Sequence, residues 1–162
     1  MKGAERMEYC AFSPEDYAVF RELANAYYRE GEDADTPQEQ VDAFIRFLFE
    51  RVMDREISGC LAKDGSSYAG FAMWGVDKEG FAFSEMPGWG TILEIGLIPE
   101  YRACGQGKAF VAFIENCLRS ANVQRCYVSA YGPAQGFWAH CGYTDSGKKA
   151  GSGLTIMIKS LE

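Results

Sequence analysis

The sequence predicts an α/β protein of the α+β kind, with a single mixed, mostly antiparallel central sheet flanked by helices. Apolar residues recur at helical spacing within residues 13–56 and again after residue 105. Between them, and in the last 40 residues or so, the pattern changes to that of strands. We therefore expect the element order β-α-α-β-β-β-α-β-α-β-β. A length of 162 residues predicts one domain over residues 1–162.

A short strand over residues 6–12 is expected to precede two helices. Ser13 is expected to cap the first helix, with Pro14 at its first position, and "GEDAD" ends it. Thr36 and Glu39 predict a capping box at the start of the second helix. The apolar faces comprise Tyr17, Phe20, Leu23, Ala24 and Tyr27 in the first helix, and Val41, Phe44, Ile45, Leu48 and Val52 in the second.

The rest of the chain alternates strands with helices. "SGCLAK" and "YAGFAMWGV" flank the turn signal "KDGSS" and predict a hairpin. "TILEIGLI", residues 91–98, is expected as a buried strand, and a helix should follow from about residue 105 to 121. The remaining expected elements are the strand "RCYVSAY", the short helix "PAQGFWAH", and a pair of strands over residues 143–145 and "GLTIMIKSL".

Composition excludes several classes of function. The net charge is −7, and residues 13–56 hold 12 acidic and five basic residues, so we expect no nucleic-acid binding. That acidic segment could instead favour a cationic substrate, or simply be a solvated surface. No apolar run approaches the length of a membrane span, and "MKGAERMEYC" has no signal-peptide pattern. The six cysteines match no metal-binding spacing, so we expect reduced thiols, no metal and a cytoplasmic location.

The stretch "YRACGQGKAF", residues 101–110, combines basic residues with glycines just before the predicted helix. It fails the Walker A pattern, because Arg102 replaces the first glycine and Ala109 replaces the Ser or Thr. It also fails the dinucleotide pattern, because Phe110 replaces the third glycine. The pattern that the loop does fit is Arg-x-x-Gly-x-Gly, formed by Arg102, Gly105 and Gly107. Glycines let backbone N–H groups turn toward an anion at a helix N-terminus, so this loop could hold a pyrophosphate.

The surrounding sequence resembles the GNAT superfamily of N-acetyltransferases. "LEIGLIPEYRACGQGKAFVAFIE" is similar to the family's acetyl-CoA segment, in which a strand ending in Pro-x-x-Arg-x-x-Gly-x-Gly leads into a helix. "AQGFWAHCGY", residues 134–143, resembles the family's second segment, which is close to Ala-x-x-Phe-Tyr-x-x-x-Gly-Phe. The specific resemblance covers about residues 90–145, and the element order extends it across the chain.

The resemblance implies acetyl-CoA as cosubstrate. The strand before the loop would offer backbone groups to the pantetheine arm, and the loop amides would bind the pyrophosphate. Lys108 would either contact a phosphate or point to solvent. The implied cosubstrate-binding residues are Ile95, Leu97, Ile98, Arg102, Ala103, Cys104, Gly105, Gln106, Gly107, Lys108, Ala109, Phe137 and Trp138.

Acetyl transfer to an amine needs a base, and Glu94 is our candidate because a glutamate within "ILEIGLI" is costly to bury unless it is paired or functional. A salt bridge or an outward orientation is the other interpretation, and Glu85 is a weaker candidate base. Trp138 stands where members of the family often have a tyrosine that acts as the general acid and protonates the CoA thiolate. An indole cannot serve as a general acid near neutral pH. The acid would then be Tyr131 or water. We expect Tyr143 in the core and His140 on the surface.

These observations favour an N-acetyltransferase acting on a primary amine of a small molecule or peptide. The second hypothesis is an acyl-CoA-binding protein with a sensing or structural role and no turnover, which Trp138 keeps open. A phosphate-binding module unrelated to CoA is the third, and the failed motif tests argue against it. A homodimer is expected only because it is common among soluble proteins.

Overall fold

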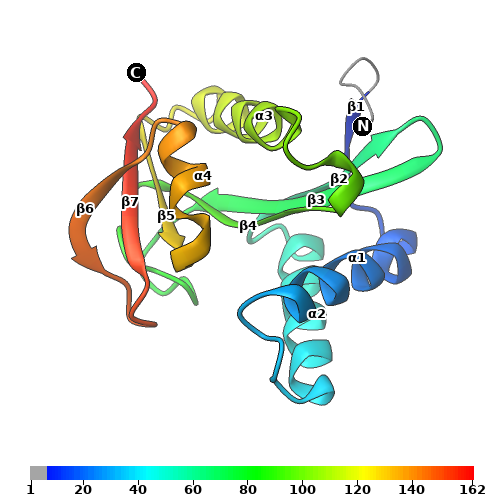
Figure 1. Ribbon diagram of the computed structural model, residues 1–162. Coiled ribbons are helices and arrows are strands. Elements are labelled where there is room, and N and C mark those ends of the chain that lie inside the picture. Colours follow the sequence, from blue (N-terminus) through cyan, green and yellow to red (C-terminus); the bar gives the residue numbers. More distant parts are fainter. Residues whose placement is uncertain (1–6) are drawn as a thin grey trace. The chain divides into compact units, whose positions relative to one another are not determined.

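The computed structural model describes residues 7–162 and contains one seven-stranded sheet flanked by four helices (Figure 1). The strand order is β1-β2-β3-β4-β5-β7-β6. β4 and β5 are parallel, whereas β1–β2, β5–β7 and β6–β7 are antiparallel, so the predicted mixed sheet is confirmed. The strands are β1 Met7–Ala11, β2 Ser58–Asp64, β3 Ser67–Val76, β4 Gly90–Leu97, β5 Arg125–Ala130, β6 Thr144–Lys149 and β7 Thr155–Ser160. The helices are α1 Tyr17–Glu30, α2 Gln38–Met53, α3 Gln106–Ser120 and α4 Gln135–His140, with short 3₁₀ turns at Pro14–Asp16, Pro99–Tyr101 and Gly132–Ala134.

The described chain forms two compact units. The first runs up to Met73 and resumes over Glu94–Gly107. Its helices α1 and α2 lie side by side (Figure 1). Phe20, with none of its surface exposed, lies at the centre of an aromatic cluster. Its ring centroid is 5.0 Å from that of Phe12, 5.8 Å from that of Phe49 and 5.4 Å from that of Phe71. Aromatic contacts of this kind join both helices to β3.

The second unit comprises Trp74–Leu93 and Lys108–Glu162. Its buried residues include Phe110, Val111, Ile114 and Leu118 of α3, as the helical spacing predicted. A buried carboxylate, Asp77, organises the loop between β3 and β4. Its Oδ2 accepts hydrogen bonds from the Tyr127 hydroxyl at 2.7 Å and from the backbone N–H groups of Glu85 and Met86 at 2.8 and 2.7 Å. One charged side chain thus fixes a 13-residue loop whose sequence shows no regular pattern.

The predicted hairpin is confirmed, with Gly65 at a φ of +60° in its turn. The capping box at Thr36 is wrong. Helix α2 begins at Gln38 after Pro37, and the Thr36 hydroxyl donates to Asp33 Oδ1 instead, at 3.0 Å. The guanidinium of Arg29 binds the backbone carbonyls of this turn, which holds Thr36 away from the helix start. Arg6, the expected first strand residue, lies outside the described residues.

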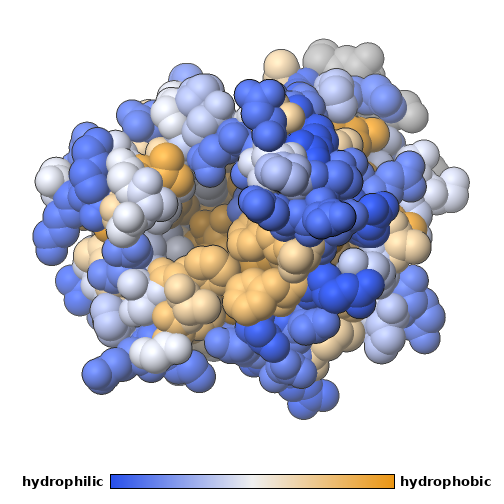
Figure 2. All heavy atoms as spheres, turned by 90° about the horizontal axis from the view of Figure 1, so that it is seen from below, coloured by the Kyte–Doolittle hydropathy of each residue, from blue (hydrophilic) through white to orange (hydrophobic). Residues whose placement is uncertain are grey.

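Hydrophobic side chains gather in the middle of the face seen in Figure 2 and are bordered by hydrophilic ones. Among the residues that the structure describes, no helix is both long and apolar enough to cross a membrane. In the same residues, no group of three or more His, Cys, Asp or Glu side chains could hold a metal ion.

Candidate active site

The residue just before the glycine loop, Tyr101, is held in place by burial and by a hydrogen bond. Tyr101, at the end of the 3₁₀ turn after β4, is fully buried, and its hydroxyl donates to Asp64 Oδ2 at 2.9 Å. Beyond it, Ala103 and Gly105 both have positive φ angles, of +59° and +85°, and α3 starts at Gln106. In the described residues, the N–H groups of Ala103 and Gly105 donate to no backbone carbonyl. Left-handed residues just before a helix N-terminus create the concave set of amides that binds anions.

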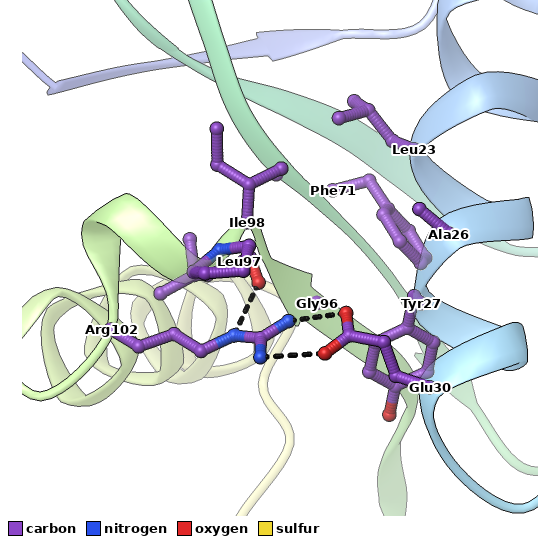
Figure 3. Close-up of a pocket in the computed structure, with 11 residues that line it drawn as sticks. Leu23, Ala26, Tyr27, Glu30, Phe71, Gly96, Leu97, Ile98 and Arg102 are labelled. Carbon is purple, nitrogen blue, oxygen red and sulfur yellow. Dashed lines mark hydrogen bonds and ion pairs between the residues drawn. The ribbon is translucent and has the colours of Figure 1, made fainter.

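The arginine of the loop does not point toward those amides. Its guanidinium makes a bidentate ion pair with Glu30 of α1, with N–O distances of 2.8 and 2.7 Å (Figure 3). Its Nε donates to the carbonyl oxygen of Leu97 at 2.8 Å. Arg102 therefore ties the loop and the end of β4 to α1. Any phosphate contact of the motif would come from the backbone.

A small pocket lies beside this ion pair. It is lined mainly by apolar groups of α1, β3 and the end of β4, among them Leu23, Ala26, Tyr27, Phe71, Gly96 and Ile98 (Figure 3). Gly96 is required here, since a Cβ atom at this position would lie 2.8 Å from the Tyr27 ring and 2.9 Å from the Phe71 ring. The missing side chain lets α1 approach β4 closely.

Glu94, the predicted base, lies on β4 two residues before Gly96 and is half-buried. Residues two apart on a strand face the same side, so the Glu94 side chain points toward α1. Burial raises the pKa of Glu94 from 4.5 to about 8, the nearby Tyr28 hydroxyl lowers it in part, and Glu32 and Asp33 raise it further. No cation among the described residues forms an ion pair with it. A carboxyl group that titrates near neutral pH can accept a proton from an ammonium.

The end of β4 holds the residues predicted to contact pantetheine. Among the described residues, Gly90 and Thr91 at the start of β4 pair with β5. Both backbone groups of Ile98 already have partners, because its N–H donates to Ala69 and its carbonyl accepts from Tyr101, at 2.8 and 3.0 Å. Both backbone groups of Ile98 are therefore already used, and so is the Leu97 carbonyl, which accepts from Arg102.

Gln106 differs from the other loop residues. Only 2% of its surface is exposed, and its side-chain Nε2 has no hydrogen-bond partner among the described residues. Lys108 and Ala109, by contrast, are exposed on the first turns of α3.

The second unit holds the other predicted residues. Tyr131, at the end of β5, is 38% exposed. Trp138 of α4 is buried, and its ring centroid lies 5.1 Å from that of half-buried Phe137 and 5.2 Å from that of Tyr143. The buried Tyr143 and the exposed His140 are as expected. Trp138 is thus an aromatic core residue of α4, which is consistent with a side chain that does not act as a general acid.

Two carboxylates of this unit have structural partners. Glu85, the weaker candidate base, accepts a hydrogen bond from the N–H of Gly151 at 2.8 Å. Glu115 is buried and accepts from the Tyr143 hydroxyl at 2.9 Å and from Lys159 Nζ at 3.0 Å.

The sequence interpretation missed Tyr28 and Glu30 of α1. Tyr28 follows Phe20 and Ala24 at intervals of four residues, so the helical stripe could have revealed it. Glu30 lies 72 residues from Arg102, and no local pattern connects them.

Comparisons with known proteins identify the family. A sequence model of the GNAT acetyltransferase family matches residues 17–143. The chain belongs to the GNAT acetyltransferase family. No curated protein matches the sequence.

Solved GNAT structures share the fold. The PaiA N-acetyltransferase from Thermoplasma acidophilum, solved with coenzyme A, superposes with a TM-score of 0.73 at 17% identity, covering 95% of this chain and 98% of its own. YhbS from Escherichia coli, also with CoA, gives 0.67 at 15%, covering 100% and 85%. A GNAT acetyltransferase from Staphylococcus aureus gives 0.72 at 12%, covering 96% and 99%. Identities this low show the fold alone, and the site residues of this GNAT protein rest on its own geometry.

Proposed function

We propose that the protein is an N-acetyltransferase that moves an acetyl group from acetyl-CoA directly to a primary amine of a small molecule or peptide. The observation that carries the proposal is the Glu94 carboxyl, which is half-buried on β4, has no cationic partner among the described residues, and has a pKa of about 8. A base that titrates near neutral pH is what deprotonation of an ammonium requires. Family membership and the anion-binding geometry of the glycine loop support the acetyl-CoA part.

Acetyl-CoA would bind mainly through the backbone. The amides from Arg102 to Ala109 would hold the pyrophosphate, with the N-terminus of α3 directed at it. Ile95 and Leu97 would bond with the pantetheine arm, and Phe137 and Trp138 would contribute apolar surface. Lys108 is exposed and free to approach a phosphate.

The transfer would proceed by direct attack. Glu94 takes one proton from the ammonium, and the amine nitrogen then attacks the thioester carbonyl. As the C–N bond forms and the C–S bond breaks, the nitrogen gives its second proton to water, and the CoA thiolate gains a proton from Tyr131 or from water. The exposure of Tyr131 allows it to meet a substrate, and its role as the acid stays a prediction.

The alternative is an acyl-CoA-binding protein of the same fold that senses acyl-CoA without turnover. The buried Trp138 favours it, because the position lacks the acid that family members often place there. A cytoplasmic location belongs to the proposal, because none of the cysteines among the described residues forms a disulfide. That both units act as one domain, and that the protein forms a homodimer, also remain predictions.

Calorimetric titration with acetyl-CoA tests whether the protein binds this cosubstrate, and desulfo-CoA and ATP are the comparison ligands. An amine screen read by mass spectrometry then tests turnover. Glu94→Gln should lower kcat by about 100-fold or more with little change in acetyl-CoA affinity, whereas Glu22→Gln, an exposed residue of α1, is the matched control. Turnover that is unchanged in Glu94→Gln would rule out the base. Binding without any turnover would favour the sensor.

A further inference from the structure

A pocket of the first unit lies between α1 and the segment that leads from β4 into the glycine loop (Figure 3). Its floor is buried, since Phe71 of β3 is 1% exposed and Gly96 of β4 is buried as well. Its mouth lies at the surface, because Ala26 of α1 and Pro99 after β4 line it and are both exposed. The pocket therefore combines a buried floor with a mouth that a ligand can reach.

The charged groups of this pocket are satisfied by each other. Glu30 and Arg102 form the bidentate ion pair that runs along one border in Figure 3. The rest of the lining is mainly apolar and includes the side chains of Leu23, Phe71 and Ile98. Because neither charge needs a counter-ion from a ligand, the pocket favours a small apolar group.

The pocket lies where the proposed acetyl-CoA site changes from strand to loop. Residues 97–99 and Arg102 line it, and the amides with positive φ that would hold the pyrophosphate follow directly, at Ala103 and Gly105. In acetyl-CoA, a carbon atom with two methyl groups stands between the pyrophosphate and the first amide of the pantetheine arm. The order of chemical groups along the ligand is therefore the order of strand, apolar pocket and anion-binding loop along the chain.

We infer that this pocket receives the two methyl groups of the pantoyl part of acetyl-CoA, so that α1 contributes to cosubstrate binding through Leu23 and Ala26. The inference rests on the proposed function and specifies how its cosubstrate is held. Burial of two methyl groups should strengthen binding about tenfold. The ion pair between Arg102 and Glu30 would then form the border of the methyl site.

The test removes the methyl groups from the ligand and fills the pocket from the protein. Calorimetry on the full-length protein compares acetyl-CoA with an analogue in which hydrogens replace the two methyl groups. Wild type should bind acetyl-CoA about tenfold more tightly than the analogue. Ala26→Leu adds bulk at the mouth and should bind both ligands alike, whereas Ala18→Leu, at an exposed position of α1 outside the lining, should keep the tenfold difference.

A third ligand distinguishes a filled pocket from a damaged loop. Adenosine 3′-phosphate 5′-diphosphate, the part of CoA that ends at the pyrophosphate, should bind wild type and Ala26→Leu within about twofold. A methyl preference that is absent in wild type or retained in Ala26→Leu would overturn the inference, as would an equal loss of affinity for this third ligand. If the preference and its loss hold but no amine is acetylated, the transferase proposal fails and the methyl site stands. If amines are acetylated without a methyl preference, the inference alone fails.

Discussion

Replacing Glu94 with glutamine should change how the stability of the protein depends on pH. The pKa of Glu94 rises from 4.5 to about 8 on folding, chiefly because of burial. At about 1.4 kcal/mol for each pH unit, that rise corresponds to roughly 5 kcal/mol for ionising the carboxyl in the folded protein. The side chain keeps some contact with water, so we expect about 2 to 4 kcal/mol in practice.

The direction follows from proton linkage. Between pH 4.5 and 8 the unfolded chain loses the Glu94 proton while the folded protein keeps it, so the free energy of unfolding falls as the pH rises. Above pH 8 both states are ionised and the full cost is present. Glu94→Gln removes this cost. It should match wild type near pH 5 and exceed it by about 2 to 4 kcal/mol near pH 8.5.

Urea denaturation followed by tryptophan fluorescence, at several pH values from 5 to 8.5, measures the difference between the two proteins. Taking the difference cancels titrations that Glu94 does not influence, whereas Tyr27, Tyr28 and Glu32 interact with it and contribute to the difference. Glu22→Gln, the exposed control, should give a flat difference near zero. A flat difference for Glu94→Gln as well would refute the argument, since the carboxyl would then titrate alike in both states.

Three further variants test separate parts of the structure. Tyr28→Phe removes the buried hydroxyl that hydrogen-bonds Glu94 and lowers the pKa of that carboxyl, so the pH-dependent loss of stability caused by Glu94 should extend to higher pH in urea denaturation; an unchanged pH dependence would mean that the hydroxyl does not act on the carboxyl. Gly105→Val forces a β-branched residue into a φ of +85° in the loop and should weaken acetyl-CoA binding at least about tenfold by calorimetry. Gly65→Val is its control, because it meets a φ of +60° and open space in the hairpin, and equal affinities of the two variants would contradict the loop assignment. Asp77→Asn weakens bonds to two N–H groups and one hydroxyl and should lower the free energy of unfolding in urea by about 2 to 4 kcal/mol; a change below 1 kcal/mol would show that the loop is held by other contacts.

Local pattern predicted the elements of the fold well. Helical spacing in α1, α2 and α3 depends on residues three or four apart, and strand alternation depends on residues two apart. Both signals lie within short windows of sequence. The predicted capping box at Thr36 was wrong because another partner for the Thr36 hydroxyl, Asp33, lies three residues away. Thr36 donates to Asp33, and Arg29 binds the carbonyls of that turn.

The candidate site was predicted only in part, because its decisive contacts are distant in sequence. The glycine loop and Glu94 can be recognised from local sequence, because glycines are unusual at the start of a helix and a glutamate is unusual within an apolar strand. The ion pair between Arg102 and Glu30 spans 72 residues, and the bond between Tyr127 and Asp77 spans 50. In the sequence, Glu30 is one of the 12 acidic residues in residues 13–56, and no local pattern sets it apart from the other 11.

The position of Arg102 explains how one unit could hold an anion and a cation. In the proposed site, a loop that binds pyrophosphate would need positive potential, whereas the carboxyl of Glu94 would add negative charge, and Glu94 and residues 102–107 of the loop belong to the first unit. Glu30 is the acidic group that the Arg102 side chain reaches, and without this ion pair its negative charge would oppose a phosphate bound by the loop. By pairing with Glu30, Arg102 neutralises one carboxylate, which in the proposed site would leave the backbone amides to meet the phosphates. In this proposal the motif arginine acts by neutralising Glu30, and a lysine at position 102 would lose the bidentate ion pair with Glu30 and the hydrogen bond to Leu97.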